Sequence, residues 1–103
     1  MSHMQLSHTR PVQDQWAGIS QADADAKTTA IYEVIGKHNG DVKAVAWQPS
    51  TTTLVSIIDY PDELSAQKSV AEILALGTLE FVSIDALWDV GEWTAMVRSA
   101  ANA

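Results

Sequence analysis

Residues 41–60 read DVKAVAWQPSTTTLVSIIDY, and this stretch decides the fold. The runs 41–48 and 53–59 are rich in Val, Ala, Ile and Thr, and the four residues between them, 49–52, have the composition of a turn. Two such runs joined by a short turn predict a β-hairpin.

Helical patterns flank this hairpin on both sides. Upstream, Ser20 followed by Asp23 is typical of a capping box, and apolar residues then recur at three- and four-residue spacing until Asn39 and Gly40. Downstream, Pro61 suits the first turn of a second helix, and Gly77 is typical of a left-handed helix end. The hairpin therefore lies between two predicted helices.

Two further strands complete the predicted order. Residues 79–87 read as a strand, and Asp89 after it is a suitable cap for a short C-terminal helix. Residues 5–10 contain one strong hydrophobe, Leu6, but the arrangement calls for a strand there. The resulting β-α-β-β-α-β order predicts a ferredoxin-like α+β fold: one four-stranded antiparallel sheet with both helices on one face.

Length and composition set further limits. A chain of 103 residues with 47% hydrophobic and 18% charged residues is expected to fold as a single domain. Residues 1–4 resemble a tag remnant, so the predicted domain spans residues 5–103 and His3 is left out of site arguments. The net charge of −7 argues against nucleic acid and anionic membranes as partners. Without a membrane-spanning run or signal sequence, a cytoplasmic location is expected.

Alternation along the strands sorts their side chains into two faces. A small or branched, wholly apolar set is assigned to the face beneath the helices: Val42, Ala44, Ala46, Val55, Ile57, Val82 and Ile84. A mixed set of larger apolar and some polar residues is assigned to the open face: Lys43, Val45, Trp47, Leu54, Ser56, Ile58, Phe81, Ser83 and Asp85. Because an apolar patch of that size is unusual on a monomer, we expect a second copy of the chain to cover the mixed face, sheet against sheet.

From Thr53 onward the chain resembles the glycine-tyrosine-aspartate (GYD) domain family, small bacterial proteins of the dimeric α+β barrel superfamily. The resemblance is carried by Leu54, Val55, Ile57, Pro61, Asp62, Glu63, Ala66, Ala75, Leu76, Gly77, Leu79, Val82 and Glu92, while Thr51, Thr52 and Thr53 stand where the naming triplet falls. It implies a ferredoxin-like fold and a homodimer. Related dimeric barrels include cofactor-independent monooxygenases, polyketide cyclases, haem-degrading enzymes and ligand-sensing modules.

His8 is the candidate general acid or base, because a histidine on a central strand could reach a barrel lumen and titrate near neutral pH. Arg10 or Asp85 would assist it. The neighbours Ser7 and Thr9 make this strand unusually polar for a central position, which a polar cavity would explain. Alternatively, the segment is a loose terminal arm in water.

Residues of the mixed face and nearby aromatic side chains complete the predicted ligand site: Trp16, Trp47, Ser56, Ile58, Tyr60, Phe81 and Ser83. Simple core or dimer packing is the alternative for the aromatic residues. His38 is interpreted as a residue at a helix C-terminus that interacts with the helix dipole. We expect no cofactor: no metal-binding spacing and no glycine-rich phosphate loop are present.

Together these patterns predict a homodimer that binds a small, mostly apolar organic molecule, with cofactor-free acid–base chemistry of the cyclase or monooxygenase type left open. The alternative is a non-catalytic interaction or assembly module, in which the mixed face is only a subunit contact and the terminal helix docks another protein through Trp93. A haem-associated protein is a third reading, with His8 or His38 as axial ligand.

Overall fold

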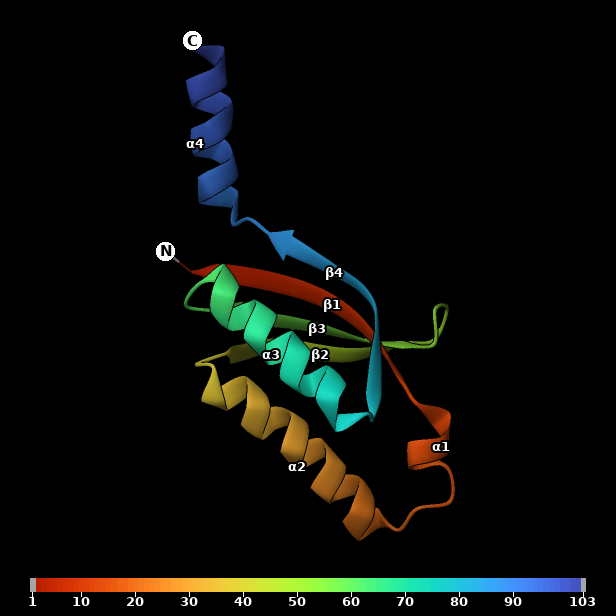
Figure 1. Cartoon of the computed structure of the whole chain (residues 1–103). Coiled ribbons are helices and arrows are strands. Elements are labelled where there is room, and N and C mark those ends of the chain that lie inside the picture. Colours follow the sequence, from red (N-terminus) through yellow and green to blue (C-terminus); the bar gives the residue numbers. More distant parts are fainter. Residues whose placement is uncertain (1, 103) are drawn as a thin grey trace.

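The computed structural model describes residues 2–102 and has the predicted α+β order. Figure 1 shows the elements: β1(His3–Pro11), α1(Gln13–Trp16), α2(Gln21–Lys37), β2(Asp41–Gln48), β3(Thr53–Tyr60), α3(Glu63–Leu76), β4(Leu79–Leu87) and α4(Val90–Ala101). The ferredoxin-like prediction is confirmed, with the single-turn helix α1 as an addition. None of the described helices has the length and apolar character needed to cross a membrane.

The four strands form one antiparallel sheet in the order β2-β3-β1-β4. The polar segment 5–10 is the middle of a regular strand, not a loose arm. It lies between β3 and β4, with Ser7 opposite both Ser56 and Ile84. Two neighbouring strands give its backbone groups hydrogen-bond partners, so strand formation here does not depend on the β-propensity of its side chains.

Short polar residues cap the helices. The Ser20 side chain accepts a hydrogen bond from the Asp23 N–H at 3.1 Å, as the capping pattern predicted. In α3 the cap is Asp62, whose side chain accepts from the Ser65 N–H at 2.7 Å. Pro61 therefore precedes the helix and does not lie in its first turn. Gly77, with φ of 75°, ends α3 in the predicted left-handed conformation.

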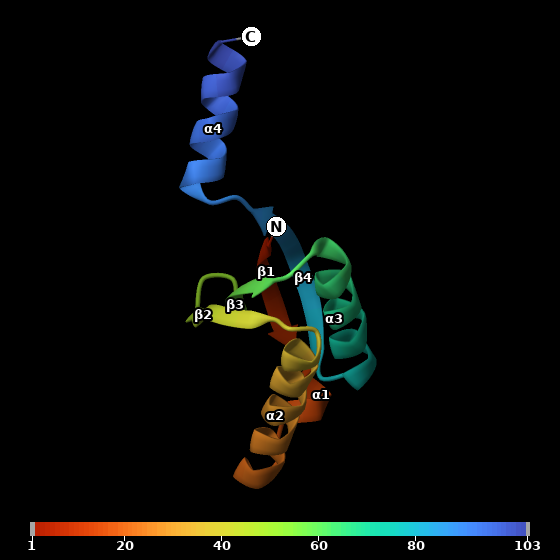
Figure 2. The same ribbon diagram turned by 90° about the vertical axis from the view of Figure 1, so that its left-hand side faces the viewer.

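Both long helices, α2 and α3, lie on the same face of the sheet, and both views show that no helix covers the other face (Figures 1 and 2). The buried core therefore forms between the helices and the sheet, around Tyr60. It consists of Ile35, Ile58, Tyr60, Ala66, Ile73 and Leu79. We call the side under α2 and α3 the covered face and the opposite side the uncovered face.

The structure reverses the predicted faces over most of the hairpin. Six residues assigned to the open face lie on the covered face instead: Val45, Trp47, Leu54, Ser56, Ile58 and Phe81. Four residues assigned to the face beneath the helices lie on the uncovered face: Ala44, Ala46, Val55 and Ile57. Alternation sorts side chains into two groups but does not say which group meets the helices, so the grouping was predictable and the facing was not.

Two register shifts also break strict alternation. Between Val42 and Ala44 the pairing of β2 skips Lys43, so Val42 stays on the covered face, as predicted, while Ala44 does not. A second shift, in the β1–β4 pairing, separates Phe81 from Ser83. Beyond it the prediction holds: Ser83 and Asp85 lie opposite uncovered-face residues, and Ile84 lies opposite Ser7 on the covered face.

Candidate functional site

A cavity of about 300 Å³ lies between the covered face and the helices α1, α2 and α3. Its floor is the sheet and its walls are apolar helix side chains. The strands contribute Gln5, Ser7, Thr9, Pro11, Val42, Val45, Leu54, Ser56, Ile58, Tyr60, Leu79 and Phe81, and the helices contribute Trp16, Thr28, Ile31, Tyr32, Ile35, Val70 and Ile73. The described residues that line it thus belong to one chain, and Tyr32 and Val45 at its edge are exposed to solvent.

A row of polar side chains runs along the floor of this cavity. Gln5, Ser7 and Thr9 are successive inward-facing residues of β1, each at least nine-tenths buried. Alternate residues of a strand lie about 7 Å apart, so the row presents polar groups at regular intervals. The three side chains line the cavity, so they are placed to offer hydrogen bonds to a molecule inside it.

Among residues 2–102, no charged side chain lines the cavity. Its deepest polar group is the Tyr60 phenol, which is 1% exposed and exchanges a hydrogen bond of 2.8 Å with the Ser69 hydroxyl. Burial raises the pKa of Tyr60 above its ordinary value, and the hydrogen bond with Ser69 opposes that shift. The phenol is therefore neutral at neutral pH, and the cavity favours a neutral occupant.

Trp16 forms one wall of the cavity and is held by a hydrogen bond to a residue far away in the sequence. Its indole Nε1 donates to the Thr78 carbonyl at 2.7 Å. The same carbonyl accepts from the Val12 N–H at 3.0 Å. The single-turn helix α1 is thereby fixed to the start of β4, which positions Trp16 against the cavity.

Five of the seven predicted ligand-site residues come together here: Trp16, Ser56, Ile58, Tyr60 and Phe81. Trp47 does not line this cavity; it lies in a shallow surface depression with Arg10 and Pro11. Ser83 pairs with His8 and faces the uncovered side.

The three residues predicted to carry acid–base chemistry lie away from the cavity. His8 and Asp85 are on the uncovered face, and the His8 Nδ1 lies 3.2 Å from the Thr53 hydroxyl. Arg10 is exposed, donates to the Thr51 carbonyl at 3.3 Å and lies 3.8 Å from the Glu80 carboxylate. The structure does not bring these groups to the space where a ligand would sit.

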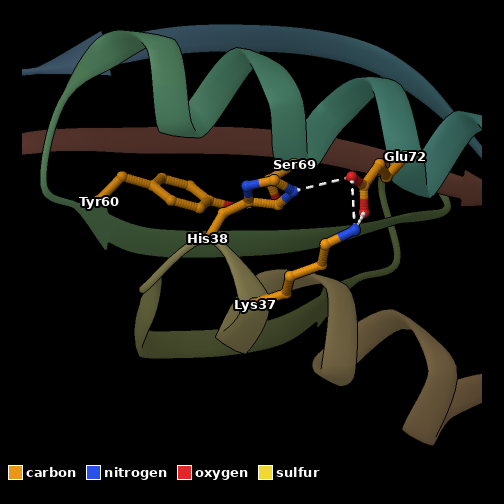
Figure 3. A network of polar contacts seen from close by, with 5 residues as sticks. All are labelled: Lys37, His38, Tyr60, Ser69 and Glu72. Atoms are coloured by element: carbon orange, nitrogen blue, oxygen red, sulfur yellow. Dashed lines mark hydrogen bonds and ion pairs between the residues drawn. The ribbon is translucent and has the colours of Figure 1, made fainter.

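A polar network of Lys37, His38 and Glu72 connects the end of α2 to α3 (Figure 3). The Lys37 Nζ donates to the Glu72 carboxylate at 3.0 Å, and the His38 Nε2 lies 3.1 Å from the same oxygen. The hydrogen bond from Lys37, together with that from His38, lowers the pKa of Glu72, although partial desolvation opposes the shift. His38 thus occupies the C-cap of α2, as predicted, and its ring is directed to Glu72 and not into the cavity.

Within residues 2–102, no group of three or more acidic, histidine or cysteine side chains is placed to hold a metal ion. Neither His8 nor His38 lines the cavity, so the residues present do not fit an axial haem ligand there.

The sequence predicted one wall residue, Trp16, and the floor residues Ser56, Ile58, Tyr60 and Phe81, but Gln5, Ser7 and Thr9 were not included in the predicted ligand site. The available signal was the polarity of this central strand, combined with the apolar Leu6 between Gln5 and Ser7. That alternation places the polar residues on one face together.

No protein-family model matches the chain, and a search of curated proteins finds no significant match.

Proposed function

We propose that this protein binds a small, neutral, mostly apolar molecule in the cavity between the sheet and α2 and α3 of a single chain. The observation that carries the proposal is the row Gln5, Ser7 and Thr9: three polar side chains, each at least nine-tenths buried, that face mostly apolar walls. The predicted ligand-binding role is kept, and the site moves from a space between two subunits to the interior of each one.

The chemistry of the lining defines the ligand class. A volume of about 300 Å³ is at the small end of ordinary ligand pockets. The apolar walls favour a hydrocarbon or aromatic body, and the floor favours hydroxyl, carbonyl or amide groups along one edge. A charged ligand would lose its hydration without gaining an ion pair, because no charged residue lines the cavity.

Binding without chemistry is the activity that this lining supports best. Proton transfer by a side chain requires a group within hydrogen-bond reach of the ligand. Tyr60 is the most buried titratable lining group, and its raised pKa makes the phenol a hydrogen-bond donor and not a base. A catalytic role for His8 would require a substrate on the uncovered face.

The test uses 2-naphthol as a neutral probe with one hydroxyl, naphthalene as the same body without it, and naphthalene-2-sulfonate as the charged analogue. Fluorescence titration is expected to show binding of 2-naphthol, weaker binding of naphthalene and none of the sulfonate. Ser7→Ala removes one floor hydroxyl, which corresponds to about 0.5–1.5 kcal/mol, or roughly a 2- to 13-fold loss of 2-naphthol affinity.

The matched control is Ser83→Ala, which removes a hydroxyl from the uncovered face of the same sheet and is expected to leave 2-naphthol affinity unchanged. Val70→Trp narrows the cavity from α3 and is expected to abolish binding of both neutral probes. Binding that survives Val70→Trp in a folded protein, or equal losses in the two serine variants, would place the probe elsewhere and overturn the proposal. If neither neutral probe binds the wild-type protein, the cavity holds only water.

A further inference from the structure

The cavity borders on the shallow surface depression that contains Trp47. Pro11 and Trp16 line both hollows, so the two are direct neighbours. Along β2 the edge of the cavity is Val45, which is 44% exposed, and the next residue on the same face, Trp47, lines the depression. Side chains two residues apart on one face of a strand lie about 7 Å from each other. A molecule that extends from the cavity past Val45 therefore reaches the depression.

The depression differs from the cavity in its charge. Arg10 contributes to its lining, beside the indole rings of Trp16 and Trp47 and the ring of Pro11. Aromatic walls suit an apolar chain, and a guanidinium suits a carboxylate, to which it donates two parallel hydrogen bonds. The two hollows together thus combine an apolar space, an apolar path and a cation at its end.

The contacts of Arg10 leave its guanidinium able to bind an anion. Its Nη2 donates to the Thr51 carbonyl at 3.3 Å, and its Nη1 lies 3.8 Å from the Glu80 carboxylate. A guanidinium has five N–H donors, and these two contacts occupy at most two of them. The side chains of Arg10 and Glu80 are 45% and 58% exposed, so their ion pair contributes little to stability. A carboxylate with better geometry is therefore able to replace Glu80.

The local charge of the depression opposes the overall charge of the chain. The net charge of −7 disfavours anions at long range. At physiological salt, however, charges further away than about 8 Å are largely screened. Among residues 2–102, Arg10 is the only charged residue that lines the depression. An anion inside it is therefore governed mainly by a positive charge.

We propose that the ligand is an amphipathic carboxylic acid whose apolar body occupies the cavity and whose carboxylate binds Arg10 in the depression. This inference rests on the proposed function, because the body is the neutral part assigned to the cavity. The spacer between body and acid must cover about 7 Å, the distance from the level of Val45 to that of Trp47. An acid attached directly to the body would lie in the cavity without a cation. The role of Arg10 here is binding, and it is independent of the acid–base role predicted for it beside His8.

The test uses probes that share the naphthalene body. They are 2-naphthol, naphthoxyacetate with a short spacer, naphthoxyhexanoate with a long one, and naphthoxyhexanamide, which has the long spacer without the charge. Calorimetric titration of the wild-type protein is expected to show about 5-fold tighter binding of the hexanoate than of the hexanamide, because charge-assisted hydrogen bonds are stronger than neutral ones. This preference is expected to decrease as salt is added. The acetate is expected to bind more weakly than 2-naphthol.

Variants locate the carboxylate and the spacer. Arg10→Gln removes the cation and is expected to abolish the preference for the hexanoate, whereas Arg10→Lys is expected to keep part of it. The matched control is Arg98→Gln, which removes an exposed arginine from α4 and is expected to keep the whole preference. Trp47→Ala removes a wall of the depression and is expected to weaken binding of both long probes relative to 2-naphthol. Titration of each variant with 2-naphthol reports whether its cavity is intact.

The outcomes separate this inference from the proposed function. If the wild-type protein binds 2-naphthol but binds the hexanoate and the hexanamide equally, the inference is overturned and the proposed function stands. If 2-naphthol does not bind, both fall. A preference that survives Arg10→Gln places the carboxylate at another cation, and a preference that Arg98→Gln also abolishes reflects net charge and not a site. Either of these two results overturns the assignment of Arg10.

Discussion

The polarity of the two faces of β1 is the reverse of what is expected for a sheet strand in a monomeric protein. Its covered residues Gln5, Ser7 and Thr9 are polar, whereas Leu6 lies on the uncovered face. In a self-sufficient subunit the apolar residues would face the helices. The difference places the polar side of the central strand against the cavity and Leu6 on the side that no described helix covers.

On β3 the two faces are distinguished by depth of burial. Ile58 is 5% exposed against the helices, while its neighbour Ile57 is only partly buried and lies between Leu6 and Ala44 on the uncovered face. Two adjacent isoleucines of one strand therefore allow packing under the helices to be compared with packing on the bare face.

The largest expected effect separates these two residues. Ile58→Ala removes side-chain volume from the core and is expected to lower the free energy of unfolding by about 2–5 kcal/mol. Ile57→Ala is expected to cost less, because the Ile57 side chain is only partly buried and less apolar surface returns to water when it is removed. Urea denaturation of the two variants in dilute solution distinguishes the two outcomes.

The comparison fails if both variants lose the same stability in dilute solution. That result would mean that Ile57 is already buried by its own chain and that the uncovered face is covered intramolecularly.

The fold was predictable because its signals are local. The hairpin 41–60, the Ser20 cap and the Gly77 helix end each follow from residues close in sequence, and all three are present. Residues 5–10 form a strand because β3 and β4 pair with them on both sides, and both of these strands are distant in the sequence. Its polarity therefore left a loose arm as an open alternative.

It was less predictable which side chains of each strand lie beneath the helices, for two physical reasons. Alternation groups side chains correctly but does not say which group meets the helices. The prediction accordingly grouped Ser56, Ile58 and Phe81 on one face. These three residues do line one cavity, but it lies on the face opposite to the predicted one. The register shift beside Lys43 has no clear sequence signature, and it moves Val42 to the same face as Val45.

A smaller effect is expected where α2 approaches the covered face. A Cβ at Gly40 would lie 2.6 Å from Cγ2 of Ile35 and 2.8 Å from Cε1 of Tyr60, both buried. Gly40→Ala is therefore expected to lower the free energy of unfolding by about 1–3 kcal/mol, because the core must shift to admit it. Thermal and urea denaturation measure the loss.

Gly36→Ala provides the matched control, four residues earlier in α2. A Cβ there meets nothing within 4 Å, and alanine favours a helix interior over glycine by up to about 1 kcal/mol. The variant is expected to be as stable as the wild type or more so. A stable Gly40→Ala protein would show that the contact between α2 and the covered face is loose.

The smallest expected effect concerns the polar network that holds α2 to α3 over the covered face. The hydrogen bonds from Lys37 and His38 lower the pKa of Glu72, so the folded state favours its carboxylate more than the unfolded state does. This contribution to stability is present above the ordinary glutamate pKa of about 4.5 and is lost as pH falls through the lowered value. Glu72→Gln is therefore expected to be less stable than the wild type at neutral pH and to lose less stability on acidification.

Denaturation with urea at pH 7 and at stepwise lower pH values measures both differences. The effect is expected to be smaller than those of Ile58 and Gly40, because the Glu72 side chain is 38% exposed and its ion pairs are screened by water and salt. Glu33→Gln removes a carboxylate from an exposed position of α2 and should reproduce neither difference. Equal pH dependence in the wild type and Glu72→Gln would show that packing of Ile35 and Ile73, and not this network, holds the two helices over the cavity.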